Sequence, residues 1–265
     1  MQTVASALGR LLNEVSWEGN ARKYRNGGPG LENVLTAEVF QALDFLPRTE
    51  FFGRIIRSAV GGSPETLNTV AEQVEDLTFR LLPGDIILTE HQPNGEGRLN
   101  VQPDGILESA GAYCMLEAKR IKRGAFMPEQ LAREFLALVQ EAGSRRGLLL
   151  LVLPSPPPVN VDRHGRLALH DAVTKFLPQV LQRLPGRFPS VGELYSRVDS
   201  TLAYTTWQRI EEQVGIAAAQ FSSDDQSVKR CIGRLAAAVV NGIQWHGRKA
   251  DRKVKLIDGP NVAVP

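Results

Sequence analysis

The chain has 265 residues, of which 43% are hydrophobic and 23% are charged, a balance typical of a folded globular protein. Its formal charge of +2 and isoelectric point of about 8.6 are too mild to indicate nucleic-acid binding by overall electrostatics, so any such surface must be local. The longest apolar run, residues 148–153, is too short to cross a bilayer, and residues 1–15 lack the pattern of a signal peptide. Two cysteines far apart, Cys114 and Cys231, suit a reducing compartment. We therefore expect a cytoplasmic protein that does not enter a membrane.

Helical spacing of apolar residues predicts a first helix over residues 31–46, which ends at Pro47. A second helix is predicted over residues 64–82, because Ser63 is placed as an N-cap and Pro64 suits the first turn. The apolar period then changes to that of strands. Strands are predicted over residues 85–90, 98–107 and 112–119. Their short connections predict an antiparallel meander.

A helix over residues 128–142 and an apolar strand over 147–153, covered on both faces, complete this unit. The proline-rich run 154–158 marks its edge. Further on, the sequence predicts a hairpin over 160–169 that turns at His164, helices over 170–184, 191–215 and 224–241, and a weakly patterned basic tail from His246. The domain organisation that we expect is an N-terminal segment (1–30), a catalytic core (31–155) and a hairpin and helical extension (156–265).

Charged residues in the predicted strands are the strongest functional signal. Strand alternation places Glu117 and Lys119 on one face of their strand, with Asp104 on the neighbouring strand. An unpaired charge inside a covered sheet costs several kcal/mol, and a bound cation would offset that cost. Two carboxylates supply the hard oxygen ligands that Mg²⁺ or Mn²⁺ prefers.

The pair Pro103-Asp104, followed after twelve residues by Glu117-Ala118-Lys119, resembles the signature of the PD-(D/E)XK nuclease superfamily. The resemblance covers about residues 31–153. It implies an α/β protein with a restriction-endonuclease-like αβββαβ core, in which helices flank a mixed sheet, followed here by a C-terminal helical extension. It also implies hydrolysis of phosphodiester bonds by water activated at Mg²⁺ or Mn²⁺.

Residue roles follow from the same resemblance. Asp104 and Glu117 would hold the metal, with the carbonyl of Ala118 as a further ligand. Lys119 would stabilise developing charge or help to deprotonate the attacking water, a role that a depressed pKa in a metal site would favour.

Members of this superfamily commonly add an acidic residue from the first core helix and a glutamine from the helix after the third strand. Glu32 and Glu38 are both available for the acidic position, and we prefer Glu32 because it lies in the first turn. Gln130 matches the glutamine, with Arg133 beside it on one helical face.

A basic cluster follows the third strand directly. Arg120, Lys122 and Arg123 are expected, together with Arg133, to contact phosphates of a nucleic acid. DNA is the expected substrate and bacterial antiviral defence, restriction or repair the expected setting, while RNA remains open because the phosphate chemistry is the same. The alternative from another class is a non-catalytic module that binds nucleic acid or a partner protein. A homo-oligomer or a subunit of a larger assembly is compatible with either function.

Overall fold

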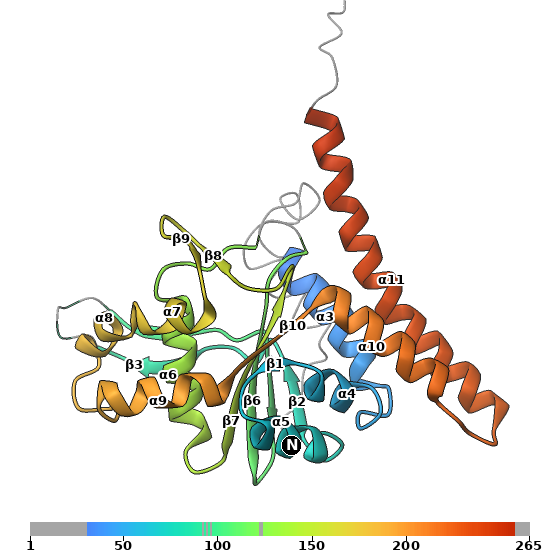
Figure 1. Ribbon diagram of the computed structural model, residues 1–265, viewed down its shortest axis with the longest axis horizontal. Helices are drawn as coiled ribbons and strands as arrows, with labels where there is room; N and C mark the ends of the chain where they lie inside the picture. Colours follow the sequence, from blue (N-terminus) through green and yellow to red (C-terminus); the bar gives the residue numbers. More distant parts are fainter. Residues whose placement is uncertain (1–30, 92, 94, 96, 122–123, 258–265) are drawn as a thin grey trace, which may run out of the picture.

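The structure is a computed structural model that describes residues 31–91, 93, 95, 97–121 and 124–257, without the side chains of Leu31 and of 248–257. The predicted N-terminal segment, 1–30, thus lies outside the described residues. The protein is an α/β protein in which helices pack on a six-stranded mixed sheet, and a long helix closes the described chain (Figure 1). These features confirm the predicted class and the predicted mixed sheet flanked by helices.

The main sheet has the strand order β1-β10-β7-β6-β5-β2. Its strands are β1 (Val60–Gly61), β2 (Thr78–Leu81), β5 (Gly105–Glu108), β6 (Ala112–Ala118), β7 (Arg146–Leu153) and β10 (Leu202–Thr206). β7 runs parallel to both β6 and β10, and the other neighbours are antiparallel. Every residue of β6 is buried, which is expected for a strand covered on both faces.

Two layers of helices cover this sheet (Figure 1). One layer contains α3 (Leu31–Asp44), α4 (Phe52–Arg57), α5 (Pro64–Gln73), α10 (Trp207–Gln220) and α11 (Gln226–Ile257), and the other contains α6 (Gln130–Ala142), α7 (Leu169–Thr174), α8 (Leu177–Gln182) and α9 (Val191–Thr201). Cys114 and Leu116 of β6 face the first layer, and Tyr113 and Met115 face the second. The predicted alternation along this strand is therefore confirmed.

The predicted meander is only partly correct. β5 and β6 are antiparallel neighbours as expected, but their third partner is β2, which the sequence had assigned to the end of a helix. That helix ends at Gln73, since pairing with β5 outweighs the helical spacing of the apolar residues. The predicted first strand is β3 (Ile86–Thr89), which pairs with β4 (Leu99–Val101) in a separate two-stranded sheet. Pro103, which has no N–H to donate, lies between β4 and β5 in what was predicted as one strand.

The second half of the chain also departs from the prediction. The expected helix over 191–215 is interrupted by β10, whose sequence Leu-Ala-Tyr-Thr-Thr favours a strand and pairs with β7. The expected helix over 170–184 is divided into α7 and α8, with Pro178 in the first turn of the second. The hairpin of β8 (Val159–Val161) and β9 (Gly165–Leu167) is confirmed, whereas the tail after His246 is helical as far as Ile257.

Within the described residues, no helix has both the length and the apolar character that crossing a membrane requires. The two cysteines are free thiols, with Cys114 buried and Cys231 exposed. Burial raises the pKa of Cys114 to about 12, so this thiol is an unreactive core residue.

Trp207 joins the first helical layer to the end of β6. Its indole Nε1 donates a hydrogen bond of 2.6 Å to the carbonyl oxygen of Lys119, and its ring lies against Phe40. Both the ring and this bond are buried, so Trp207 fixes the backbone at the position where β6 ends.

Replacing Trp207 by Phe should therefore lower the free energy of unfolding by about 1–3 kcal/mol, since the Lys119 carbonyl would lose a buried donor. Urea unfolding of the purified variant measures this. Trp245, which is 46% exposed, provides the control, and Trp245→Phe should change stability by about 0.5 kcal/mol or less. Equal effects of the two substitutions would show that the indole bond contributes nothing to stability.

Candidate active site

The structure brings Asp104 and Glu117 together where β5 begins and β6 approaches its end. Because Gly105 pairs with Leu116, the next position places Asp104 opposite Glu117. The backbone N–H of Asp104 donates to the Leu116 carbonyl at 3.0 Å, and its Oδ2 accepts from the N–H of Ala118 at 2.7 Å. The Asp104 carboxylate is thus fixed by the backbone of the neighbouring strand.

Lys119 connects this pair to the first helix. Its Nζ lies 2.6 Å from Glu117 Oε1 and 3.2 Å from Glu32 Oε1. The other carboxylate oxygen of Glu32 accepts from the N–H of Arg120 at 3.1 Å. Glu38 instead contacts His246, with its Oε2 3.0 Å from the ring Nε2. Of the two acidic residues considered for this helix, Glu32 is therefore the one at the cluster.

The loop that follows β6 comes close to Lys119 at Gly124. A Cβ atom added at Gly124 would lie 2.8 Å from the Cβ of Lys119, which is closer than real Cβ contacts allow. Only glycine fits there without displacing Lys119.

Gln130 occupies the position predicted for it, at the start of α6. Its Nε2 donates to Glu117 Oε1 at 2.7 Å and to Glu134 Oε1 at 2.8 Å, while its Oε1 accepts from the N–H of Met127. Glu134 is a member of the cluster that the sequence analysis missed. The available signal was its spacing, since it lies four residues after Gln130 and hence on the same helical face.

The cluster holds more negative charge than its basic partners balance. Asp104, Glu117, Lys119 and Glu134 are between 2% and 7% exposed. Burial and the nearby Glu117 raise the pKa of Asp104 well above its usual range, although the Ala118 N–H opposes this. Burial likewise raises the pKa of Glu117, and burial and Glu117 raise that of Glu134.

The pKa of Lys119 is set by two opposing effects. Burial alone would lower its pKa, but the neighbouring Glu117 and Glu32 carboxylates outweigh burial and raise it. Among these carboxylates, the charged ammonium form of Lys119 is therefore favoured. Whether a bound metal depresses this pKa stays a prediction.

The donor set fits a hard divalent cation. Asp104 and Glu117 offer carboxylate oxygens, and Glu134 Oε2 is buried without a hydrogen-bond partner. In the described part of the chain, no group of three or more His, Cys, Asp or Glu side chains is arranged to hold a metal ion. Mg²⁺ commonly uses one or two carboxylates together with water and phosphate oxygens, so a pair of carboxylates is sufficient. Participation of the Ala118 carbonyl stays a prediction.

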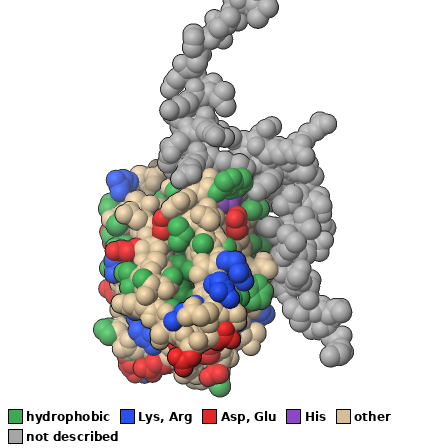
Figure 2. All heavy atoms as spheres, turned by 90° about the vertical axis from the view of Figure 1, so that its right-hand side faces the viewer, with side chains coloured by type: hydrophobic (Ala, Val, Ile, Leu, Met, Phe, Trp, Pro, Cys, Tyr) green, Lys and Arg blue, Asp and Glu red, His purple; other side chains and the backbone are tan. Residues whose placement is uncertain are grey.

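The predicted phosphate-binding residues are only partly described. Arg120 follows Lys119, is partly exposed, and its Nε lies 4.0 Å from Glu32 Oε2. Arg133 lies on α6 with its Nε buried and without a hydrogen-bond partner. Lys122 and Arg123 lie outside the described residues. Figure 2 shows one face of the molecule, on which basic side chains form small groups among acidic and apolar ones, as the mild net charge leads one to expect.

Comparison of this chain with protein-family models, with curated proteins and with solved structures gave no match. The geometry of the cluster itself is therefore the evidence for its chemistry.

The raised pKa of Glu134 predicts how stability changes with pH. The folded protein keeps this proton to a higher pH than the unfolded chain does. Stability is unaffected below the unfolded pKa of about 4.3, and it falls as the pH rises from there towards the folded value. Glu134→Gln removes this titration. In metal-free buffer, the melting temperature of the variant should therefore exceed that of the parent by more at about pH 8 than at about pH 5.

Glu193 provides a control, because its effect on stability should change with pH in the opposite direction from that of Glu134. Hydrogen bonds from Ser190 lower its pKa, so its contribution to stability is present above the unfolded pKa and is lost as the pH falls. Glu193→Gln should consequently cost more stability at about pH 8 than at the pH where the carboxylate is protonated. If the difference in melting temperature between Glu134→Gln and the parent did not depend on pH, the raised pKa assigned to Glu134 would be wrong.

Proposed function

We propose that the protein is a nuclease that uses Mg²⁺ or Mn²⁺ to hydrolyse phosphodiester bonds, with DNA as its substrate. The observation that carries this proposal is the convergence of Asp104, Glu117 and Lys119 in one buried, hydrogen-bonded cluster where β5 begins and β6 ends. A salt-bridge cluster on an exposed surface would not need such burial, and it would contribute little to stability.

The arrangement of the elements supports the same proposal. The helix α3 precedes the antiparallel strands β2, β5 and β6, and α6 then leads to β7, which is parallel to β6. This order resembles the αβββαβ core of restriction-endonuclease-like proteins, with the acidic pair where that core carries its active site. Further support comes from Glu32 and Gln130, which both contact residues of the motif.

Each residue of the cluster has a role that its contacts suggest. The Ala118 N–H orients the Asp104 carboxylate, and Gln130 holds Glu117. A divalent cation held by these two carboxylates would lower the pKa of a bound water and neutralise charge on the phosphate. The Lys119 ammonium, held by Glu32, is placed to stabilise the charge that develops on the phosphate oxygens. Its raised pKa favours this electrostatic role over that of a general base.

Contacts to the substrate backbone are proposed for four basic residues, Arg120, Lys122, Arg123 and Arg133. Of these, Arg120 lies at the cluster, because it shares Glu32 with Lys119. Phosphate contacts of this kind position the substrate and give no preference for a base sequence.

The proposal predicts that Asp104→Asn reduces metal-dependent cleavage by about a hundredfold or more, because the amide loses the charge that a cation requires. Asparagine retains an oxygen that accepts from the Ala118 N–H, so the fold should be preserved. The measurement is cleavage of single-stranded DNA, duplex DNA and RNA, with Mg²⁺, with Mn²⁺ and with neither.

Asp224, which is exposed in the loop between α10 and α11, is the matched control. Asp224→Asn should cleave at the parent's rate. If the parent cleaves none of these substrates with either metal, or if Asp104→Asn cleaves as fast as the parent, the alternative of a non-catalytic binding module takes precedence.

A further inference from the structure

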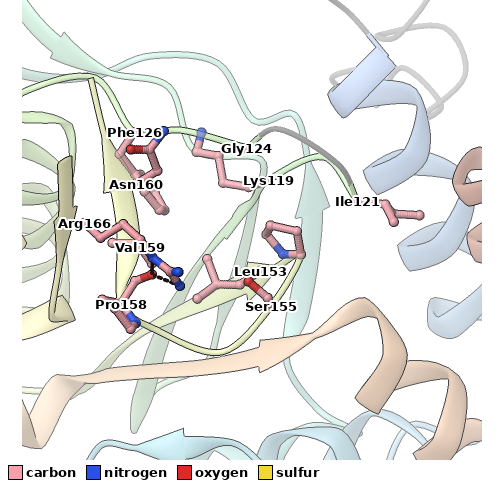
Figure 3. Close-up of a pocket in the computed structure, with 11 residues that line it drawn as sticks. Lys119, Ile121, Gly124, Phe126, Leu153, Ser155, Pro158, Val159, Asn160 and Arg166 are labelled. Carbon is pink, nitrogen blue, oxygen red and sulfur yellow. Dashed lines mark hydrogen bonds between the residues drawn. The ribbon is translucent and has the colours of Figure 1, made fainter. Parts of the chain in front are cut away.

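A pocket of about 420 Å³ lies beside the buried cluster, next to the hairpin of β8 and β9 (Figure 3). Lys119 lines this pocket and also contacts Glu117 and Glu32, so the pocket and the cluster share a side chain. The volume lies in the range of sites that enclose a small molecule or part of a larger one. Of the residues that line it, only Lys119 has a role in the proposed cleavage of the phosphodiester.

The walls of the pocket combine apolar and polar surface. Phe126, Leu153 and Val159 are buried lining residues, and the Lys119 Nζ lies 4.9 Å from the centre of the Phe126 ring. Polar groups come from the hairpin and from the segment before it, with Asn160 and Ser155 both exposed. A pocket that presents both apolar and polar surface suits a nucleobase, which has apolar faces and a polar edge.

Two contacts hold the polar groups of the hairpin in place. The Nε and Nη2 atoms of Arg166 donate to the carbonyl oxygen of Pro158 at 3.2 and 3.1 Å (Figure 3). The guanidinium is thereby fixed at the pocket, while its other N–H groups can bind a ligand. The backbone carbonyl of Asn160 accepts from the N–H of Phe126 at 2.9 Å, which attaches the hairpin to the segment that follows β6.

We propose that this pocket receives the base of one unpaired nucleotide adjacent to the phosphate bound at Lys119. The substrate class would then be single-stranded DNA, or duplex DNA that contains an unpaired nucleotide. A base within a paired and stacked duplex cannot enter a pocket without first leaving the stack. This inference rests on the proposed function for the position of the phosphate, whereas the recognition of a base depends on the pocket alone.

Binding without cleavage tests the pocket separately from the chemistry. The full chain would be titrated, in EDTA, against three fluorescein-labelled probes, and fluorescence anisotropy would be recorded. The probes are a single-stranded oligothymidylate, an abasic strand with the same number of phosphates, and a fully paired hairpin. The parent should bind the oligothymidylate about tenfold more tightly than the abasic strand, the effect expected from one base contact.

Arg166 and Arg163 form a matched pair of variants, because both lie on the hairpin and each change to Gln removes one positive charge. Arg163, whose side chain is 88% exposed, does not line the pocket. Arg166→Gln should reduce the tenfold preference for the base-containing strand to about threefold or less, and Arg163→Gln should leave it unchanged. A second variant, Asn160→Ala, should reduce the preference as Arg166→Gln does.

Three results would overturn the pocket proposal: equal affinity of the parent for the oligothymidylate and the abasic strand, equal effects of the two arginine variants, or binding of the paired hairpin as tight as that of the single strand. Failure of the proposed function has a different signature. It would appear as absence of metal-dependent cleavage by the parent, and the preference for an unpaired base in EDTA would be retained.

Discussion

Burial of several carboxylates beside one lysine, at the end of the central strand, is the constraint on which the rest of this structure depends. Asp104, Glu117 and Glu134 are almost completely buried, and burial disfavours their charged forms. The protein compensates with a few well-placed donors, namely the Ala118 N–H, the Gln130 amide and the Lys119 ammonium. These donors leave Glu134 Oε2 without a partner. The cluster therefore lowers stability in the metal-free protein and is suited to receive a positive ion.

The fold provides this environment by covering both faces of the sheet. Strand β6 carries apolar side chains to both helical layers, with Glu117 next to its last residue and Lys119 directly after it. Elements far apart in the sequence meet at that point, since Trp207 binds the Lys119 carbonyl and Glu32 binds its ammonium. A site that is assembled from rigid strands and helices can hold a cation and a phosphate with little rearrangement.

Local patterns in the sequence were sufficient to locate most of the cluster. The alternation along β6 placed Glu117 and Lys119 on one face, and the position of Glu32 in the first turn of its helix favoured it over Glu38. The resemblance of Pro103-Asp104 and Glu117-Ala118-Lys119 to a nuclease motif added Asp104, on the neighbouring strand, and Gln130 to the predicted site. The cluster predicted from the sequence did not include Glu134, because a glutamate on a helix is usually solvated and its burial depends on tertiary packing.

Non-local pairing explains the elements that the sequence did not predict. β2 and β10 are short strands whose residues also fit a helical pattern, and their state is decided by pairing with β5 and β7. The pocket also depends on contacts between residues far apart in the sequence. Asn160 and Arg166 line it together with Lys119 because the hairpin of β8 and β9 packs there. The direction of the Lys119 pKa shift was likewise out of reach, because it depends on the distances to Glu117 and Glu32.

We propose that Asp104 and Glu117 form a site for a divalent cation. The most direct test of this proposal is the electron paramagnetic resonance signal of free Mn²⁺, measured as the metal is added to the parent and to Glu117→Gln, with Glu108→Gln on β5 as a control. We expect one Mn²⁺ to bind per parent or Glu108→Gln chain, and the affinity of Glu117→Gln for Mn²⁺ to be weaker by about tenfold or more. No binding to the parent at millimolar Mn²⁺, or equal binding to the parent and Glu117→Gln, would contradict it.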